Sequence, residues 1–255
     1  TDDLPARPRL LLITYHFPPD PAIGGLRWQK FVGHAVARGW GVDVIMRDPS
    51  ELVVTDPERS ADLPRGVRVY GVRNRTSWLD RLENSLARVT CALRTRSHTR
   101  TSTGVSTLPP RAWSLPRSQV GWPRGLRDIT RAYLSLAEHL RGQRWVADAR
   151  RTGAAIIRRG VHRVVISSGP PHFAHDVARR VAREAALPFV MDMRDPWSHV
   201  ERLSEDVASP VQLVLTTICE CRAIAHAGLV VANTEPMRAQ LCRAHPRAAF
   251  RIITV

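Results

Sequence analysis

The order of apolar and polar positions along the chain predicts buried strands that alternate with amphipathic helices. Apolar residues recur at helical spacing from Trp28 to Val36, where Gly39 is placed to end the helix, and again from Ala174 to Ala185. Short apolar runs of the kind found in strands lie at 9–14, 42–46, 67–72, 162–167, 187–192, 228–232 and 250–255.

Three further helices are expected from local signals. The pattern over 126–158 is helical, with candidate breaks at Gly142 and Gly153. Ser209 is followed by proline and, three positions on, by glutamine, which is typical of a helix start. Thr234 can cap another short helix near the end of the chain.

Apolar strands that alternate with helices indicate a parallel sheet covered on both faces. We therefore expect an α/β fold, doubly wound and Rossmann-like, with a mostly parallel sheet of about seven strands. Residues 1–255 are expected to form one such domain, interrupted at about 73–150 by a basic, partly irregular insertion. Folds of this class bind ligands at the carboxyl ends of their strands.

The charge balance points to an anionic partner. Lysine and arginine number 38 against 23 aspartates and glutamates, which gives a net charge of +15, and Lys30 is the only lysine. Such a surplus favours a membrane surface, a phosphorylated substrate or nucleic acid. The chain has neither an apolar run of about 18 residues nor a signal-peptide pattern, so we expect a cytoplasmic protein. Cys219 and Cys221 lack the spacing of a metal site, and no metal is expected.

The loop after the first strand, "TYHFPPDPAIGGLRWQK", can face an anion. Gly24 and Gly25 open a helix, so bare amides and the positive end of the helix dipole are available there, and Arg27 adds a charge. The loop lacks the spacing of a dinucleotide fingerprint, and Arg47 follows the second strand where an acidic residue is usual, which argues against NAD. The alternative is that the glycines only permit a tight turn.

The turn "SSGPPHFAH" follows a later strand. Ser168 and Gly169 leave room for a ligand near the backbone, and the two prolines stiffen the turn. His172 falls in the first turn of the next helix on its polar side, whereas His175 borders the apolar face. The alternative for each histidine is a capping or solvated role.

The segment "MDMRDPWS" ends the following strand. Asp192 and Arg194 share one face by the period of two, and Asp195 lies on the other. Buried carboxylates are costly unless they bind something. The alternative is an internal Asp–Arg pair that holds the loop and still leaves Asp195 for a substrate.

Taken together, these segments resemble the N-terminal domain of the GT-B glycosyltransferases, in the large retaining family called family 4. The resemblance covers both ends of the chain and leaves 73–150 unmatched. Two positions depart from it, because Arg194 and Gly228 stand where many relatives have histidine and aspartate. The segments that carry the resemblance are "FPPDPAIGGLR", "ARGWGVDVI", "VVISSGPPHFAH", "LPFVMDMRDPW" and "AGLVVANTEPMRAQL".

The resemblance implies an enzyme of two Rossmann-like domains, of which this chain is the acceptor-binding one. It would transfer a sugar, with retention, from a nucleoside diphosphate sugar to a glycan, a lipid-linked acceptor or a small molecule, as in polysaccharide biosynthesis. No metal or other cofactor is implied. Because the chain ends before a donor domain, we expect it to be inactive alone. Asp195, Arg194 and His172 are the expected catalytic contacts. The expected substrate-binding residues are His16, Gly24, Gly25, Arg27, Ser168, Gly169 and Asp192.

Three other interpretations remain open at this point. The arginines of 73–150, with Trp113 and Trp122, could hold the domain against anionic lipid at the inner face of the membrane. The same fold could serve a sugar-nucleotide epimerase. The charge alone could make the chain a non-enzymatic, arginine-rich domain that binds anions or nucleic acid, although it lacks a recognition motif.

Overall fold

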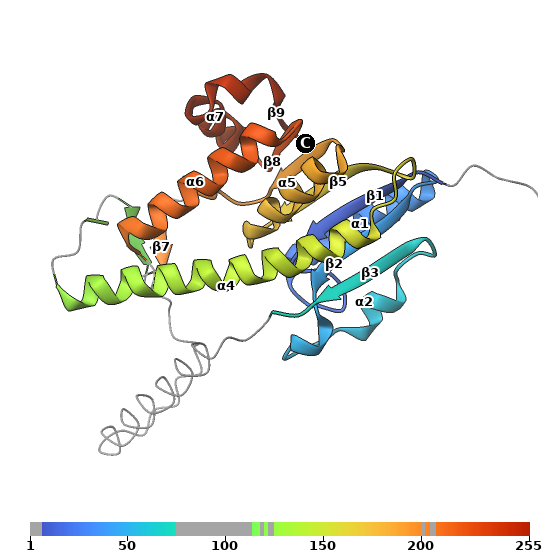
Figure 1. Cartoon of the computed structure of the whole chain (residues 1–255), viewed down its shortest axis with the longest axis horizontal. Helices are drawn as coiled ribbons and strands as arrows, with labels where there is room; N and C mark the ends of the chain where they lie inside the picture. The colour runs from blue at the N-terminus through green and yellow to red at the C-terminus, as the bar shows by residue number, and fades with distance from the viewer. Residues whose placement is uncertain (1–6, 75–113, 118–119, 122–124, 200–201, 205–207) are drawn as a thin grey trace, which may run out of the picture.

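A computed structural model describes residues 7–74, 114–117, 120–121, 125–199, 202–204 and 208–255, and its centre is a seven-stranded parallel sheet (Figure 1). The strand order is β3-β2-β1-β5-β6-β8-β9, and every neighbouring pair is parallel. The predicted doubly wound α/β fold is thus confirmed. The strands are β1 Arg9–Thr14, β2 Gly41–Arg47, β3 Val67–Val72, β5 His162–Gly169, β6 Phe189–Met193, β8 Leu229–Ala232 and β9 Ile252–Thr254.

The central strands are apolar throughout because both of their faces are covered. In β1, Leu11 and Ile13 pack into the core on one face, while Leu10 and Leu12 pack into a separate core on the other. This alternation is the period of two that extended backbone imposes. The second core is closed by Trp28 and Val32 from helix α1, Ile23–Ala37.

Helices on the opposite face close the larger core. They are α4 Leu126–Ile156, α5 Phe173–Ala185 and α6 Pro210–His226, and α4 packs against both α5 and α6. Figure 1 shows α4 running along most of the length of the molecule. Ser209 caps α6 by accepting a hydrogen bond from the Gln212 amide at 3.2 Å, as predicted. The remaining helical segments are η1 Pro49–Glu51, α2 Pro57–Ala61, α7 Glu235–Ala244 and η3 Pro246–Arg251.

Helix α4 is continuous, so neither Gly142 nor Gly153 breaks it as the sequence suggested. Both glycines instead permit close packing on α5. A Cβ atom at Gly142 would lie 2.9 Å from the Phe173 ring, and one at Gly153 would lie 2.8 Å from a Val181 methyl group. Trp145 of α4 is fully buried in the core, so this part of the expected insertion belongs to the layered domain.

Two short strands were not predicted. β4 Ser114–Pro116 and β7 Arg202–Ser204 pair antiparallel in a separate two-stranded sheet. The rest of the predicted insertion, 75–113, lies outside the described residues, and so do Trp113 and Trp122, on which the membrane interpretation drew. Among the described helices, none is long and apolar enough to cross a bilayer.

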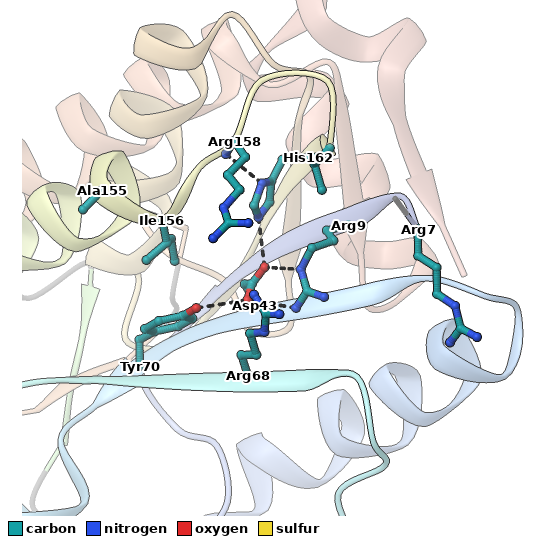
Figure 2. Close-up of a pocket in the computed structure, with 10 residues that line it drawn as sticks. Arg7, Arg9, Asp43, Arg68, Tyr70, Ala155, Ile156, Arg158 and His162 are labelled. Atoms are coloured by element: carbon teal, nitrogen blue, oxygen red, sulfur yellow. Dashed lines mark hydrogen bonds and ion pairs between the residues drawn. The ribbon is translucent and has the colours of Figure 1, made fainter. Parts of the chain in front are cut away.

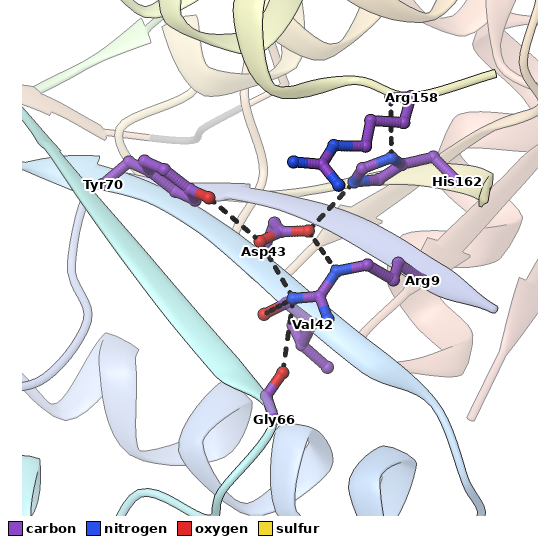
Figure 3. A network of polar contacts seen from close by, with 7 residues as sticks. All are labelled: Arg9, Val42, Asp43, Gly66, Tyr70, Arg158 and His162. Carbon is purple, nitrogen blue, oxygen red and sulfur yellow. Dashed lines mark hydrogen bonds and ion pairs between the residues drawn. The ribbon is translucent and has the colours of Figure 1, made fainter. Parts of the chain in front are cut away.

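A polar network ties four neighbouring strands together at the amino edge of the sheet (Figure 3). The Asp43 carboxylate accepts hydrogen bonds from Arg9 Nε at 2.5 Å and Nη2 at 2.9 Å, from His162 Nε2 at 3.0 Å and from the Tyr70 hydroxyl at 3.3 Å. Since His162 Nδ1 accepts from the Arg158 amide at 3.0 Å, this imidazole carries its proton on Nε2. Burial alone would raise the pKa of Asp43, but the hydrogen bonds from His162 and Arg9 outweigh it and lower the pKa to about 2.

Candidate active site

The three loops singled out in the sequence meet at the carboxyl edge of the sheet. Asp192, at the end of β6, is buried, and its Oδ2 accepts hydrogen bonds from Trp28 Nε1 at 2.8 Å and from Ser168 Oγ at 3.0 Å. Its Oδ1 lies 3.3 Å from Arg27 Nη2 in an ion pair. One carboxylate therefore joins α1, β5 and β6, and three predicted substrate-binding residues bind one another.

Arg194 lies against the amino end of α1. Its Nη1 is 2.8 Å from the place where a Gly24 Cβ would stand, so the missing side chain makes room for the guanidinium. Its Nη2 contacts Asp195 Oδ2 at 3.1 Å. The Asp195 side chain is half exposed, at 50%, and can reach a ligand. This end of α1 has no side-chain cap and no acidic residue in its first turn, which suits an anion.

His16 forms an oriented pair with a buried carboxylate. Its Nδ1 lies 2.7 Å from Asp20 Oδ2, and the same oxygen accepts a hydrogen bond from Arg47 Nη2 at 3.3 Å. Burial raises the pKa of Asp20, but the His16 hydrogen bond and the Ala22 amide outweigh it, and the net pKa is lowered. An ionised Asp20 accepts a hydrogen bond from Nδ1–H of His16, and Nε2 makes no hydrogen bond within the described part of the chain. Gly25 lets α1 pack on this loop, since a Cβ there would lie 3.1 Å from the His16 carbonyl oxygen.

The two histidines after β5 are held by internal partners. Ser167 Oγ lies 2.7 Å from His175 Nδ1, and His175 Nε2 lies 3.4 Å from His172 Nδ1. His172 also stacks on Trp197, with ring centroids 5.0 Å apart. His175 is fully buried, which corrects the expectation that it only borders the apolar face.

Desolvation sets the protonation state of this pair. Burial lowers the pKa of His172 to about 4 and lowers that of His175 well below its ordinary value, so both rings are neutral at pH 7. Gly169 is required beside them. A Cβ at Gly169 would come within 2.7 Å of His175 Nε2 and 2.9 Å of His172 Nδ1.

A cavity of about 380 Å³ opens beside His172. Its apolar wall includes Phe173, Trp197, Leu203 and Leu215. Polar groups from α4 and α6 line the rest, namely Glu138, His139, Gln143, Gln212 and Thr216. The volume and the mixed lining fit a small organic ligand or part of a larger one. Sequence analysis did not predict this cavity, because α4 and α6 supply half of its wall and no local pattern shows that they pack beside these loops.

A second cavity, of about 350 Å³, lies at the opposite edge of the sheet around the Asp43 network (Figure 2). Arg7, Arg9, Arg68 and Arg158 line it, so it is basic, unlike the cavity beside His172. It is formed by the amino ends of the strands, whereas parallel sheets bind ligands at the carboxyl ends. None of the predicted site residues lines it.

Comparison with known proteins supports the fold assignment. No protein-family model matches the sequence, and no curated protein matches it significantly. UGT2 of Phytolacca americana, solved with UDP-2fluoro-glucose and pterostilbene, is similar with a TM-score of 0.52 and 11% identity over 96% of this chain and 53% of that one. LpCGTa, solved with UDP, is similar with a TM-score of 0.51 and 14% identity over 98% of this chain and 54% of that one. The chain spans about half the length of these structures and has the fold of one half of a GT-B glycosyltransferase.

Proposed function

We propose that the chain is the acceptor-binding half of a glycosyltransferase that moves a sugar from a nucleoside diphosphate sugar to a hydroxyl group. One observation carries this proposal. Trp197, which lines the cavity, follows Asp195 by two residues, so the loop after β6 supplies both a wall of the cavity and the ion pair of Asp195 with Arg194. An acceptor in the cavity would therefore lie on the same loop as a half-exposed carboxylate, which can bind its hydroxyl group, and a guanidinium, which can stabilise the departing nucleoside diphosphate.

The roles follow from charge and exposure. Asp195, half exposed, would accept a hydrogen bond from the acceptor hydroxyl and orient it. Arg194 and the uncapped amino end of α1 at Gly24 and Gly25 would stabilise negative charge on the donor diphosphate. Asp192 is buried, its Oδ2 accepts hydrogen bonds from Trp28 and Ser168, and its Oδ1 pairs with Arg27 without a hydrogen bond, so it would position these loops and not touch the substrate.

For the stereochemistry we propose retention, in line with the family-4 resemblance. The state of the two histidines supports it. His175 is fully buried and His172 is half-buried on the cavity wall; both are neutral and hydrogen-bonded to each other, so they are poorly placed to take a proton from the acceptor. Transfer would then depend on positioning and on stabilisation of the leaving diphosphate, with no metal or other cofactor.

One feature favours inversion as the second candidate. A histidine oriented by an ionised carboxylate is the arrangement of a general base, and His16 with Asp20 has it. A base on the face opposite the leaving group would give an inverted product. The anomeric configuration of the product separates the two mechanisms.

An exposed apolar stripe on α4 supports an acceptor at a membrane surface. Its members recur at steps of three and four residues, and each side chain is at least 44% exposed. An apolar stripe on a helix with several arginines, in a chain of net charge +15, suits the surface of an anionic bilayer. The stripe consists of Leu126, Ile129, Tyr133, Leu136 and Leu140.

The test is a transfer assay on the full-length protein with a panel of nucleoside diphosphate sugars and with hydroxyl acceptors of each class. We expect nucleoside diphosphate release that depends on the acceptor, and a product whose anomeric proton shows retention by NMR. Asp195→Ala should lower turnover at least about tenfold, or ~1.4 kcal/mol of barrier, whereas Asp62→Ala on the far surface should not.

Other results of this assay would reject parts of the proposal or favour an alternative function. Unchanged kinetics in Asp195→Ala would reject its role. An inverted product that is lost in His16→Ala would assign the reaction to the second candidate. Conversion of the donor sugar without any acceptor would indicate an epimerase. No reaction with any donor would refute the transferase proposal.

A further inference from the structure

A cluster of possible metal ligands stands behind the cavity wall, outside the proposed active site. Glu220 projects from α6, His199 follows β6, and His245 directly follows α7. We propose that these three side chains form a binding site for a divalent transition metal ion, with zinc as the best fit. The proposal departs from the sequence-based expectation of no metal, and it does not depend on the proposed transfer reaction.

The donor atoms already have the spacing of a coordination shell. His245 Nε2 lies 2.9 Å and His199 Nε2 lies 3.3 Å from Glu220 Oε1, and the three ligand atoms all lie within 4.8 Å of one another. Tetrahedral zinc with bonds of about 2.0–2.2 Å places its ligand atoms roughly 3.3 Å apart. A small movement of the side chains would therefore admit the ion.

The chemistry of the set also fits zinc. Two imidazole nitrogens and one carboxylate oxygen are a common zinc donor set that leaves a fourth position for water. His199 and His245 are 26% and 13% exposed, so an ion and a water molecule can reach the site. The second oxygen of Glu220 accepts a hydrogen bond from the Ser198 amide at 2.8 Å, which fixes the direction of the carboxylate.

The electrostatics give an independent reason for a cation. The Glu220 side chain is fully buried, at 1% exposure. Within the described parts of the chain its ion-pair partners are His199 and His245, and no arginine or lysine reaches it. A buried carboxylate is costly unless hydrogen bonds and positive charge compensate it. A divalent ion would compensate it.

The alternative is a triad held by hydrogen bonds alone, with both Nε2–H groups donating to Oε1. Metal binding would require the Nε2 lone pairs, so each metal-bound ring would carry its proton on Nδ1. A bound ion would clamp the segment after β6, which carries Trp197 two residues before His199, to α6 and α7. It would thus stiffen the wall on which His172 stacks.

The experiment uses the untagged chain, because a polyhistidine tag would itself bind metal. After chelation and dialysis, ZnCl₂ is titrated by calorimetry and the zinc content is measured by mass spectrometry. We expect one equivalent of zinc per chain and a higher melting temperature in the presence of zinc. Co²⁺ should give the visible absorption of a tetrahedral site without a thiolate-to-cobalt band, which excludes Cys219, Cys221 and Cys242 as ligands.

Matched variants locate the ion. His199→Ala and His245→Ala should each weaken zinc binding more than about 100-fold, since even outer partners of a zinc ligand contribute 10–100-fold. His226→Ala is the control, because His226 lies on the same helix as Glu220, is exposed and bonds only the Arg222 carbonyl. If either ligand variant fails to fold, His199→Asn at the most exposed ligand replaces it. Absence of stoichiometric zinc, binding that survives both histidine variants, or a thiolate–cobalt band would overturn the proposal.

Discussion

Asp192→Asn tests whether one buried carboxylate holds the three loops of the site together. The carboxylate accepts hydrogen bonds from Trp28 and Ser168 and pairs with Arg27. Hydrogen bonds to a charged acceptor contribute about 1.5–3 kcal/mol each, against roughly 0.5–1.5 for a neutral one. Two weakened bonds, and an amide group turned toward Arg27, give an expected loss of about 2–3 kcal/mol in the free energy of unfolding.

The assay is urea unfolding followed by circular dichroism, with thermal unfolding beside it. For a chain of this size the loss corresponds to a melting temperature lower by about 4–10 °C. Asp195→Asn is the control, because its half-exposed ion pair with Arg194 contributes at most about 1 kcal/mol. Trp28→Phe removes one of the two hydrogen bonds to Asp192. The double variant should therefore lose less free energy of unfolding than the sum of the losses in the two single variants. If Asp192→Asn is as stable as Asp195→Asn, the reasoning is wrong.

Three other expectations concern different parts of the molecule. Because the pKa of Asp43 is lowered from 3.8 to about 2, its ionised form should contribute about 2 kcal/mol to the free energy of unfolding. This contribution is present above pH 4 and is lost as the pH falls toward 2. The difference in urea unfolding between the wild type and Asp43→Asn should therefore shrink over that pH range. Gly25→Ala should lower the free energy of unfolding by about 1–3 kcal/mol, because its Cβ would meet the His16 backbone. In Gly24→Ala the new Cβ would meet only the flexible Arg194 side chain, so this variant should impair transfer more than stability. Equal melting temperatures for the two variants would argue against this packing. In flotation assays with anionic liposomes, the double variant Leu136→Ser with Leu140→Ser should reduce binding several-fold, while Val53→Ser, at a more exposed apolar residue outside the stripe, should not. Binding that depends on neither the stripe nor anionic lipid would reject the membrane proposal.

The sheet could be predicted because its strands are apolar on both faces and its helices carry regular apolar stripes. Ser209 was recognisable as a cap because capping depends on local chemistry. The two-stranded sheet was missed because three-residue strands such as β4 and β7 show no periodicity.

The sequence predicted which residues lie at the carboxyl edge of the sheet better than it predicted their partners there. Asp192 and Arg194 were assigned to one face by the strand period, but β6 ends at Met193, so the period no longer fixes the direction of Arg194. Asp192 pairs with Arg27 instead, 165 positions away, and no local pattern could have shown that. His199, Glu220 and His245 likewise come from three separate segments that only the tertiary structure brings together.

The most direct test of the account fills one cavity at a time in the full-length protein. Thr216→Trp would fill the cavity beside His172, and Ala155→Trp would fill the arginine-lined cavity at the opposite edge of the sheet. With folding checked by thermal unfolding, acceptor-dependent release of nucleoside diphosphate should fall at least about tenfold in Thr216→Trp and remain at the wild-type level in Ala155→Trp. Full activity in Thr216→Trp, or a loss confined to Ala155→Trp, would contradict the claim that the acceptor binds at the carboxyl edge.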